Sequence, residues 1–223
     1  MTVLEEAYAG VTALLAGLSE EGLAAPSHCD GWRVRDVLVH LVLDPQRALV
    51  ACATPTDDPA SVDAVTYWAA EGGGPDDGAH AAFVRGWADA LSTAGLRRLW
   101  ADTAAAAARA VAALPAQARV RTQGHVLTVG DLADTLVVEA VVHHLDAVAG
   151  GGPLPAPGPL RAARSRLEAM AGAPVDYADA DADADVVLAL AGRPVPALPG
   201  VRPVLGRAAA GTAAAPRRPP SRR

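Results

Sequence analysis

A carboxylate and an imidazole stand four residues apart in a largely apolar stretch, residues 128–150. Residues spaced by three or four positions share one face of an α-helix, and here that face carries Leu132, Leu136, Glu139, His143 and Ala147. Burying Glu139 and His143 among apolar neighbours is unfavourable unless a partner satisfies them, and a metal ion is such a partner. The pair is therefore a candidate set of metal ligands. A simple hydrogen bond between the two side chains is the alternative.

The ends of this helix are marked in the sequence. Thr128, followed three residues later by Asp131, is typical of a capping box at a helix N-terminus. Gly150 begins a Gly-Gly-Gly-Pro stretch, which predicts the C-terminus. We therefore expect one helix of about twenty residues. His144 lies about 100° further around this helix than His143, so it cannot belong to the same site.

A third candidate ligand, His40, lies near the middle of an earlier helix expected at about residues 32–51. Asp36 and Asp44 stand one turn before and one turn after it. Periodicity alone predicts a half-exposed histidine that pairs with one of these carboxylates. Pro45 is expected to kink or interrupt the helix, because its ring clashes with the carbonyl group four residues earlier. His40 becomes a candidate ligand only with support from outside this helix.

Two motifs supply that support. Residues 26–41, PSHCDGWRVRDVLVHL, resemble the N-terminal signature of the mycothiol-dependent maleylpyruvate isomerase family, and residues 137–146, VVEAVVHHLD, resemble its second signature. The two motifs stand in the family's order and at its spacing. The resemblance covers roughly residues 1–150, with weaker similarity from Gly192-Arg193 to Gly206. Arg33 departs from the family, whose members often have a capping Ser or Thr at that place.

The resemblance implies a DinB-like bundle that holds a divalent metal, usually zinc, through His40, Glu139 and His143. Three protein ligands leave one coordination position open, as a catalytic zinc site requires. In the implied activity the metal holds the thiol of mycothiol as a thiolate, which adds to a small electrophilic substrate in isomerisation or S-transfer. Asp36 or Asp44 would orient His40. The alternatives are a metal- or ligand-binding bundle without catalytic activity, and a bundle whose site has lapsed.

Amphipathic repeats predict helices at about residues 2–18, 32–51, 79–114 and 128–150. A short hairpin is expected at about residues 120–127. The helical repeats predict an all-α fold. Because long connections after the second helix allow neighbouring helices to run parallel, we predict an up-down-down-up four-helix bundle. The expected parts are a DinB-like metal-binding helical bundle at residues 1–150, a small C-terminal extension at 151–207, and a disordered Ala/Pro/Arg tail at 208–223.

The remaining polar segments give weaker candidates. His80 and His125 have no partner at ligand spacing, so we expect both on the surface. Arg193 is a candidate for binding an anionic substrate, with a helix C-cap arginine as the alternative. The Ala-Asp repeat at residues 178–185 lacks the glycine and the closing glutamate of an EF-hand loop, which disfavours calcium. Residues 53–79 are rich in Pro, Asp and Gly and are expected to rim a pocket.

Composition sets outer bounds on function. The 223 residues contain no apolar run near the roughly 20 residues of a membrane span, and Cys29 and Cys52 offer no disulfide framework, so we expect a cytoplasmic protein. A net charge of −6 argues against a nucleic-acid partner and favours a small molecule. The resemblance implies that the partners are a small-molecule thiol and a small electrophilic substrate. All 19 basic residues are arginine, and Lys, Ile and Asn are absent. The codons of the three absent residues are AT-rich, so their absence indicates a gene from a GC-rich bacterium. Mycothiol dependence would make this bacterium an actinobacterium.

Overall fold

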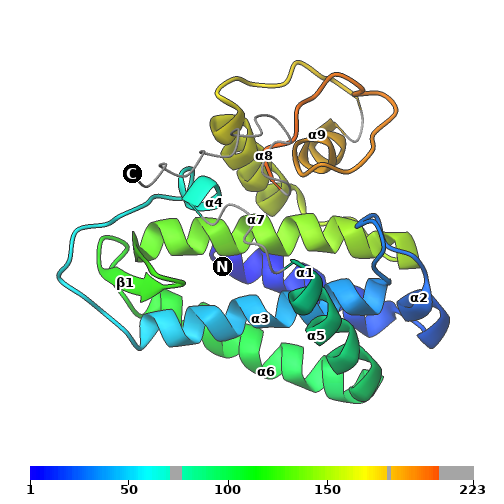
Figure 1. Ribbon diagram of the computed structural model, residues 1–223, viewed down its shortest axis with the longest axis horizontal. Coiled ribbons are helices and arrows are strands. Elements are labelled where there is room, and N and C mark those ends of the chain that lie inside the picture. The colour runs from blue at the N-terminus through cyan, green and yellow to red at the C-terminus, as the bar shows by residue number, and fades with distance from the viewer. Residues whose placement is uncertain (71–76, 180–181, 206–223) are drawn as a thin grey trace, which may run out of the picture.

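Most of the described chain is helical, which confirms the predicted predominance of helix. The structure is a computed structural model that describes residues 1–70, 77–179 and 182–205. Four of its helices pack together in the core, namely α1 (Val3–Gly17), α3 (Val34–Cys52), α6 (Thr93–Ala112) and α7 (Val129–Ala147) (Figure 1). The other helices of the described residues are α2 (Glu20–Ala24), α4 (Tyr67–Ala70), α5 (Asp77–Ala90), η1 (Val148–Gly150), α8 (Pro157–Ala171) and α9 (Ala182–Leu190). The tail predicted at 208–223 lies outside the described residues.

Side chains at the predicted positions fix where the helices begin. The Oγ1 atom of Thr128 accepts a hydrogen bond from the Asp131 amide at 3.0 Å, so α7 starts where the sequence places it. α1 begins with a reciprocal capping box between Thr2 and Glu5. At α3 the Arg33 side chain makes no cap, and the Asp36 carboxylate instead accepts from the Arg33 amide at 2.9 Å. The α3 helix runs through Pro45 to Cys52, so this proline does not interrupt it.

The core lies where α3 and α1 each pack against both α6 and α7. Trp100 of α6 donates from Nε1 to Thr12 Oγ1 at 2.9 Å, and Arg97 donates to the carbonyl oxygens of Leu15 and Leu18 at 3.0 and 2.8 Å. The start of α6 therefore lies beside the end of α1. The largest fully buried side chains are Trp100, Leu14, Leu15, Leu23, Leu38, Leu41, Leu96, Leu127, Leu132, Leu136, Leu145 and Leu167. Burial of these apolar surfaces is the main source of stability.

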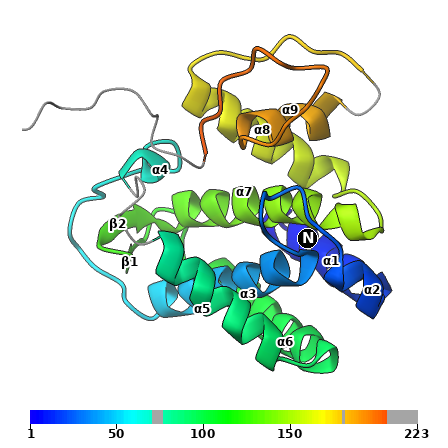
Figure 2. The same ribbon diagram turned by 45° about the vertical axis from the view of Figure 1, so that its right-hand side comes forward.

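Helix α7 lies between two groups of helices. α1 and α3 cover one side of it, and α8 packs on the other side with α9 beyond it (Figure 2). Because it has neighbours on both sides, α7 buries residues all around its circumference, including the polar Thr135, His144 and Asp146. No helix in the described ranges is both long and apolar enough to cross a bilayer. The C-terminal segment after Gly150 thus contributes directly to burying the central helix.

Connections between the long helices differ in part from the expectation. The predicted hairpin is confirmed as antiparallel β1 (Arg119–Thr122) and β2 (His125–Thr128). The loop after α3 lies against this hairpin, where the Thr56 amide donates to Arg119 O at 2.9 Å. The third helical region is two helices, because the chain breaks between α5 and the Ser92 cap of α6. The apolar spacing of the region predicted at residues 79–114 makes Phe83 a core candidate, but this side chain is 58% exposed on α5.

Two glycines let η1 pass close to α2. A Cβ atom built on Gly22 would lie 2.7 Å from the Gly150 carbonyl oxygen, and one on Gly150 would meet the Gly22 carbonyl oxygen. Neither position has space for a methyl group without a backbone shift. The end of α7 is therefore joined to the N-terminal helices by backbone contact.

We predict that Gly150→Ala lowers the free energy of unfolding by about 1–3 kcal/mol, because overpacking against backbone cannot be relieved by a side-chain rotation. Gly17→Ala is the control, since its Cβ would meet nothing within 4 Å. That substitution should leave stability unchanged or raise it slightly. Urea unfolding measures both, and equal effects of the two substitutions would contradict the close approach.

Candidate metal centre

The structure brings together the three residues singled out in the sequence. His40 comes from α3, and Glu139 and His143 come from α7. One ligand atom from each residue can be chosen so that all three lie within 4.8 Å of one another. Glu139 Oε2 lies 3.0 Å from His143 Nε2, and the rings of His40 and His143 are perpendicular with centroids 5.0 Å apart. We call these three residues the triad. The arrangement offers two imidazole nitrogens and one carboxylate oxygen to a single point, which is a donor set that divalent zinc accepts.

Electrostatics in the triad favour a cation. Burial acts to raise the pKa of Glu139, but the hydrogen bond and charge of His143 outweigh it and hold this pKa at about 2. Burial lowers the pKa of His40 to about 4, so its imidazole is neutral near pH 7. Burial also acts to lower the pKa of His143, whereas its bonds to Asp146 and Glu139 raise this pKa to about 10. The proton on His143 thus occupies the place where a divalent cation would bind, and metal binding would release it.

The second nitrogen of His143 is held by a residue that the sequence analysis missed. His143 Nδ1 lies 3.0 Å from Asp146 Oδ2, and the Asp146 side chain has no exposed surface. Arg193 donates to both oxygens of this carboxylate, from Nε at 2.9 Å and from Nη2 at 2.6 Å. Arg193 therefore lies at the site, as the sequence suggested, but its guanidinium is bound to a carboxylate of the protein. The spacing of His143 and Asp146 along one helix could have indicated their contact.

The second nitrogen of His40 is close to His80. His40 Nδ1 lies 3.1 Å from His80 Nε2, and the two rings are nearly perpendicular. His80 is exposed, as predicted, but it belongs to the site. The carboxylates expected to orient His40 have other partners: Asp36 binds Arg33, and Asp44 binds Arg47. That expectation is wrong.

Helix α5 brings His80 to the triad because two arginines of the first motif bind its C-terminal end. Arg33 donates to Asp89 at 2.8 Å, and Arg35 donates to the carbonyl oxygen of Leu91 at 2.7 Å. Nothing in the spacing of these residues along the sequence indicates the contact. The other two histidines near the triad in sequence lie elsewhere: His144 is bonded to Pro153 O at 2.9 Å, and His28 to Leu145 O at 3.1 Å.

A cavity of about 400 Å³ opens over the triad. Besides the triad its walls include Cys29, Trp32, Trp68, His80, Arg193 and Leu205. Trp68 comes from the Pro- and Asp-rich excursion that was expected to rim a pocket. Its Nε1 atom is buried and has no hydrogen-bond partner among the described residues, so it is a donor available to a ligand. Burial raises the pKa of the Cys29 thiol, which makes Cys29 a poor nucleophile.

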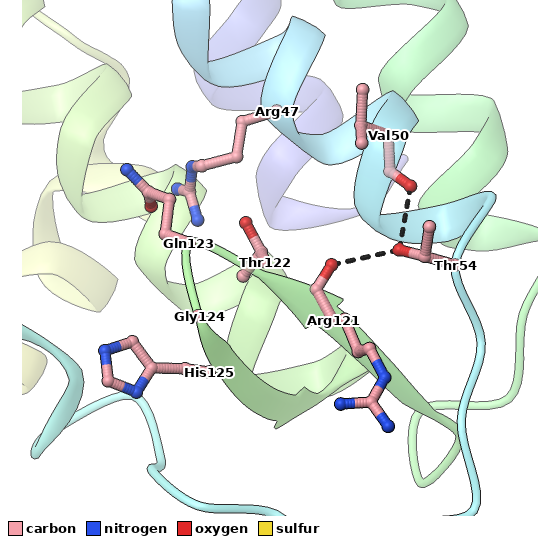
Figure 3. Close-up of a pocket in the computed structure, with 8 residues that line it drawn as sticks. All are labelled: Arg47, Val50, Thr54, Arg121, Thr122, Gln123, Gly124 and His125. Carbon is pink, nitrogen blue, oxygen red and sulfur yellow. Dashed lines mark hydrogen bonds between the residues drawn. The ribbon is translucent and has the colours of Figure 1, made fainter.

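A second pocket, of about 450 Å³, lies between the end of α3 and the turn of the β1–β2 hairpin (Figure 3). Arg47 lines it, and its guanidinium lies 5.5 Å from the centre of the Tyr67 ring. Arg47 Nε donates to Asp44 Oδ1 at 3.3 Å. Buried atoms without a hydrogen-bond partner in the described structure gather here, namely Tyr8 Oη, Asp44 Oδ2 and Arg47 Nη1. Each makes electrostatic contact with the others or with Glu139, so a buried polar cluster connects the triad to this pocket.

This cluster predicts a pH dependence of stability. Burial, and next the charge of Glu139, raises the pKa of Asp44 to about 7. Between about pH 4 and pH 7 the folded protein therefore holds a proton at Asp44 that the unfolded chain has lost, so the free energy of unfolding falls as the pH rises through this range and levels off above pH 7. In metal-free protein, Asp44→Asn should gain stability relative to the wild type between pH 5 and pH 8. Chemical unfolding at the two pH values measures this, with the exposed Asp57→Asn as control. If the difference in free energy of unfolding between Asp44→Asn and the wild type is the same at both pH values, Asp44 is ionised throughout this range.

Comparison with known proteins gives one match. Residues 4–148 match the family model described as the mycothiol maleylpyruvate isomerase N-terminal domain. The matched region contains both motifs, the triad, His80 and Asp146, whereas Arg193 and the helices α8 and α9 lie beyond it. No curated protein and no solved structure matched the chain.

Proposed function

This chain belongs to the mycothiol maleylpyruvate isomerase N-terminal domain family, and on that basis we propose that it is a divalent-metal-dependent enzyme that uses mycothiol. The observation that carries the proposal is the triad of His40, Glu139 and His143 at the base of a cavity of about 400 Å³. The substrate class is a small electrophile to which a thiol adds. The product is either an isomer of the substrate or a thiol adduct.

The residues of the triad fit a divalent cation. Two neutral imidazoles and one carboxylate suit zinc in number and type, and they leave one position open towards the cavity. When bound, such a cation supplies a Lewis acid that lowers the pKa of a coordinated thiol from about 8.5. Glu139 contributes the negative charge that balances the cation, and Asp146 fixes the ring orientation of His143. Zinc is the metal that we propose.

The side chains around the cavity define what can happen there. The indole rings of Trp32 and Trp68 line the cavity as apolar walls, which exclude water from the reacting thiolate. Cys29 stays protonated, so the incoming thiol is the nucleophile. Its sulfur adds to an electrophilic carbon of the substrate. In isomerisation the adduct rotates about the former double bond and then eliminates the thiol, whereas in transfer the adduct leaves intact.

We also propose that α1, α3, α6 and α7 form the up-down-down-up bundle that the resemblance implies. The packing of α3 and of α1 against both α6 and α7 supports this topology. The proposed bundle occupies residues 1–150, and the extension from residue 151 packs on it through α8. The enzyme would act as a small-molecule catalyst in the cytoplasm, without nucleic acid or membrane.

A binding protein without catalytic activity is the second candidate. The observation that favours it is the bidentate ion pair between Arg193 and Asp146. Because of this pair, the Arg193 guanidinium is not available to bind an anionic substrate. A thiol that binds the metal without turning over a substrate would fit this reading.

We expect purified protein to bind about one divalent metal per chain and to be stabilised by it. A ligand that binds only the native state adds about 2.7 kcal/mol at a hundredfold excess over Kd, so chelation should lower the Tm. His143→Ala and Glu139→Gln should both lose metal, whereas His125→Ala, beside the second pocket, should keep it. Metal analysis and thermal unfolding measure these effects. Unchanged metal content in His143→Ala would rule out the triad as the site.

Mycothiol binding separates the enzyme from a passive metal protein. Titrating mycothiol into cobalt-substituted protein should produce a thiolate-to-cobalt charge-transfer band in the near ultraviolet and release a proton. The affinity should rise with pH up to the pKa of the free thiol, because only the thiolate binds. Glu139→Gln should weaken both signals strongly. Protein that holds cobalt but gives neither band nor proton would leave the binding protein as the better proposal.

A further inference from the structure

Arg193 lies outside the matched region, yet its guanidinium reaches the back of the triad. We propose that Arg193 is a positioning residue, which clamps Asp146 and through it holds the His143 ring in the orientation and tautomer that metal binding needs. The C-terminal extension would then complete a site whose ligands all belong to the preceding domain. This inference rests on the proposed metal-binding function.

The geometry of the clamp is specific. Arg193 Nε donates to Asp146 Oδ1 at 2.9 Å and Nη2 donates to Oδ2 at 2.6 Å, which is the bidentate arrangement of a guanidinium and a carboxylate. Asp146 Oδ2 also lies 3.0 Å from His143 Nδ1. A carboxylate fixed in this way holds the proton on Nδ1, so Nε2, which faces His40 and Glu139, is the nitrogen that gives up its proton when a cation binds. Nε2 is therefore the atom of His143 that is free to bind a cation.

Asp146 depends on Arg193 because it is buried. Its side chain has no exposed surface, and Arg193 is only 14% exposed. A buried carboxylate that loses its cationic partner either takes up a proton or turns away, and in both cases it stops holding the imidazole. The extension makes another Arg–Asp pair with α7, between Arg166 and Asp134, but those side chains are 41% and 39% exposed. Exposed ion pairs of this kind contribute little to stability. The Arg166–Asp134 pair is therefore a matched control for the Arg193–Asp146 pair.

The chain turn after α9 places Arg193. Gly192 has a φ of +82°, a left-handed conformation that favours glycine. The turn is closed by hydrogen bonds from the Gly192 amide to Ala189 O at 3.0 Å and from the Arg193 amide to Leu188 O at 2.9 Å. The Arg193 guanidinium also donates to Ala191 O. These bonds fix the backbone at Arg193 and so the point from which its side chain reaches Asp146.

The same turn starts a segment that returns to the cavity. The Val204 amide donates to Leu190 O at 2.7 Å, and Leu205 then lines the cavity beside Arg193. The extension therefore supplies both the clamp and part of the wall. A direct role of Arg193 in binding a substrate anion is the competing interpretation, and it requires the guanidinium to leave Asp146.

The test uses full-length protein and zinc or cobalt alone. Arg193→Gln should weaken metal affinity by about 10- to 100-fold, the usual effect of removing a residue that orients a ligand, and it should alter the visible spectrum of bound cobalt. Arg166→Gln should leave affinity and spectrum unchanged. Arg193→Lys, which keeps the charge without the bidentate fork, should fall between the wild type and Arg193→Gln. It serves as the test if Arg193→Gln does not fold.

A double-mutant cycle identifies the route. In an Asp146→Asn background, Arg193→Gln should lower the metal affinity little further, because Arg193 acts through Asp146. Wild-type affinity and an unchanged cobalt spectrum in folded Arg193→Gln would overturn the proposal, and a raised KM for an anionic substrate alone would assign Arg193 to substrate binding. Nitrogen NMR of the His143 imidazole in metal-free protein gives a separate readout. If the wild type binds no metal, the proposed function fails, but the clamp can still be tested. Loss of the Nδ1 proton signal in Arg193→Gln would support the clamp, and an unchanged signal would overturn it.

Discussion

The burial of α7 between two groups of helices is the constraint on which the rest of the structure depends. A polar side chain on a buried face of such a helix has little access to water and must find its partner inside the protein. Thr135 turns back to the carbonyl oxygen of Leu132, and His144 finds the carbonyl oxygen of Pro153. Glu139, His143 and Asp146 satisfy one another in a chain that ends at Arg193. The metal centre that we propose is this chain with a cation in place of its proton.

Much of the fold could be predicted from the sequence because the signals are local. The Thr128 cap and the glycines at the other end define α7, and the Gln123-Gly124 pair marks the hairpin turn. Apolar periodicity also located α1 and α3. It failed at Phe83, because α5 turns Val84 and Ala88 to the core and leaves the neighbouring Phe83 on the outside. The interruption expected at Pro45 does not occur either, since α3 continues through it to Cys52.

The site could be predicted only in part. Glu139 and His143 were visible from their spacing, but His40 lies on a mixed helix border and required the family motif. His80 and Arg193 illustrate what local reasoning cannot reach. His80 meets His40 because Arg33 and Arg35 bind the end of α5, and Arg193 meets Asp146 because the chain folds back after α9. Both contacts join residues far apart in the sequence, where only tertiary packing decides which side chains meet.

The position of Arg193 near the end of the described chain bears on how the protein is made. Domains of a nascent chain begin to fold while the remainder is still being synthesised. The triad is complete once His143 has left the ribosome, but Asp146 then lacks the guanidinium that neutralises it until the turn after α9 has emerged. During this interval Asp146 has His143 as a partner but lacks its bidentate cationic partner. The orientation of the His143 ring is therefore fixed only after the turn that follows α9 has packed, later than the three residues of the triad themselves can meet.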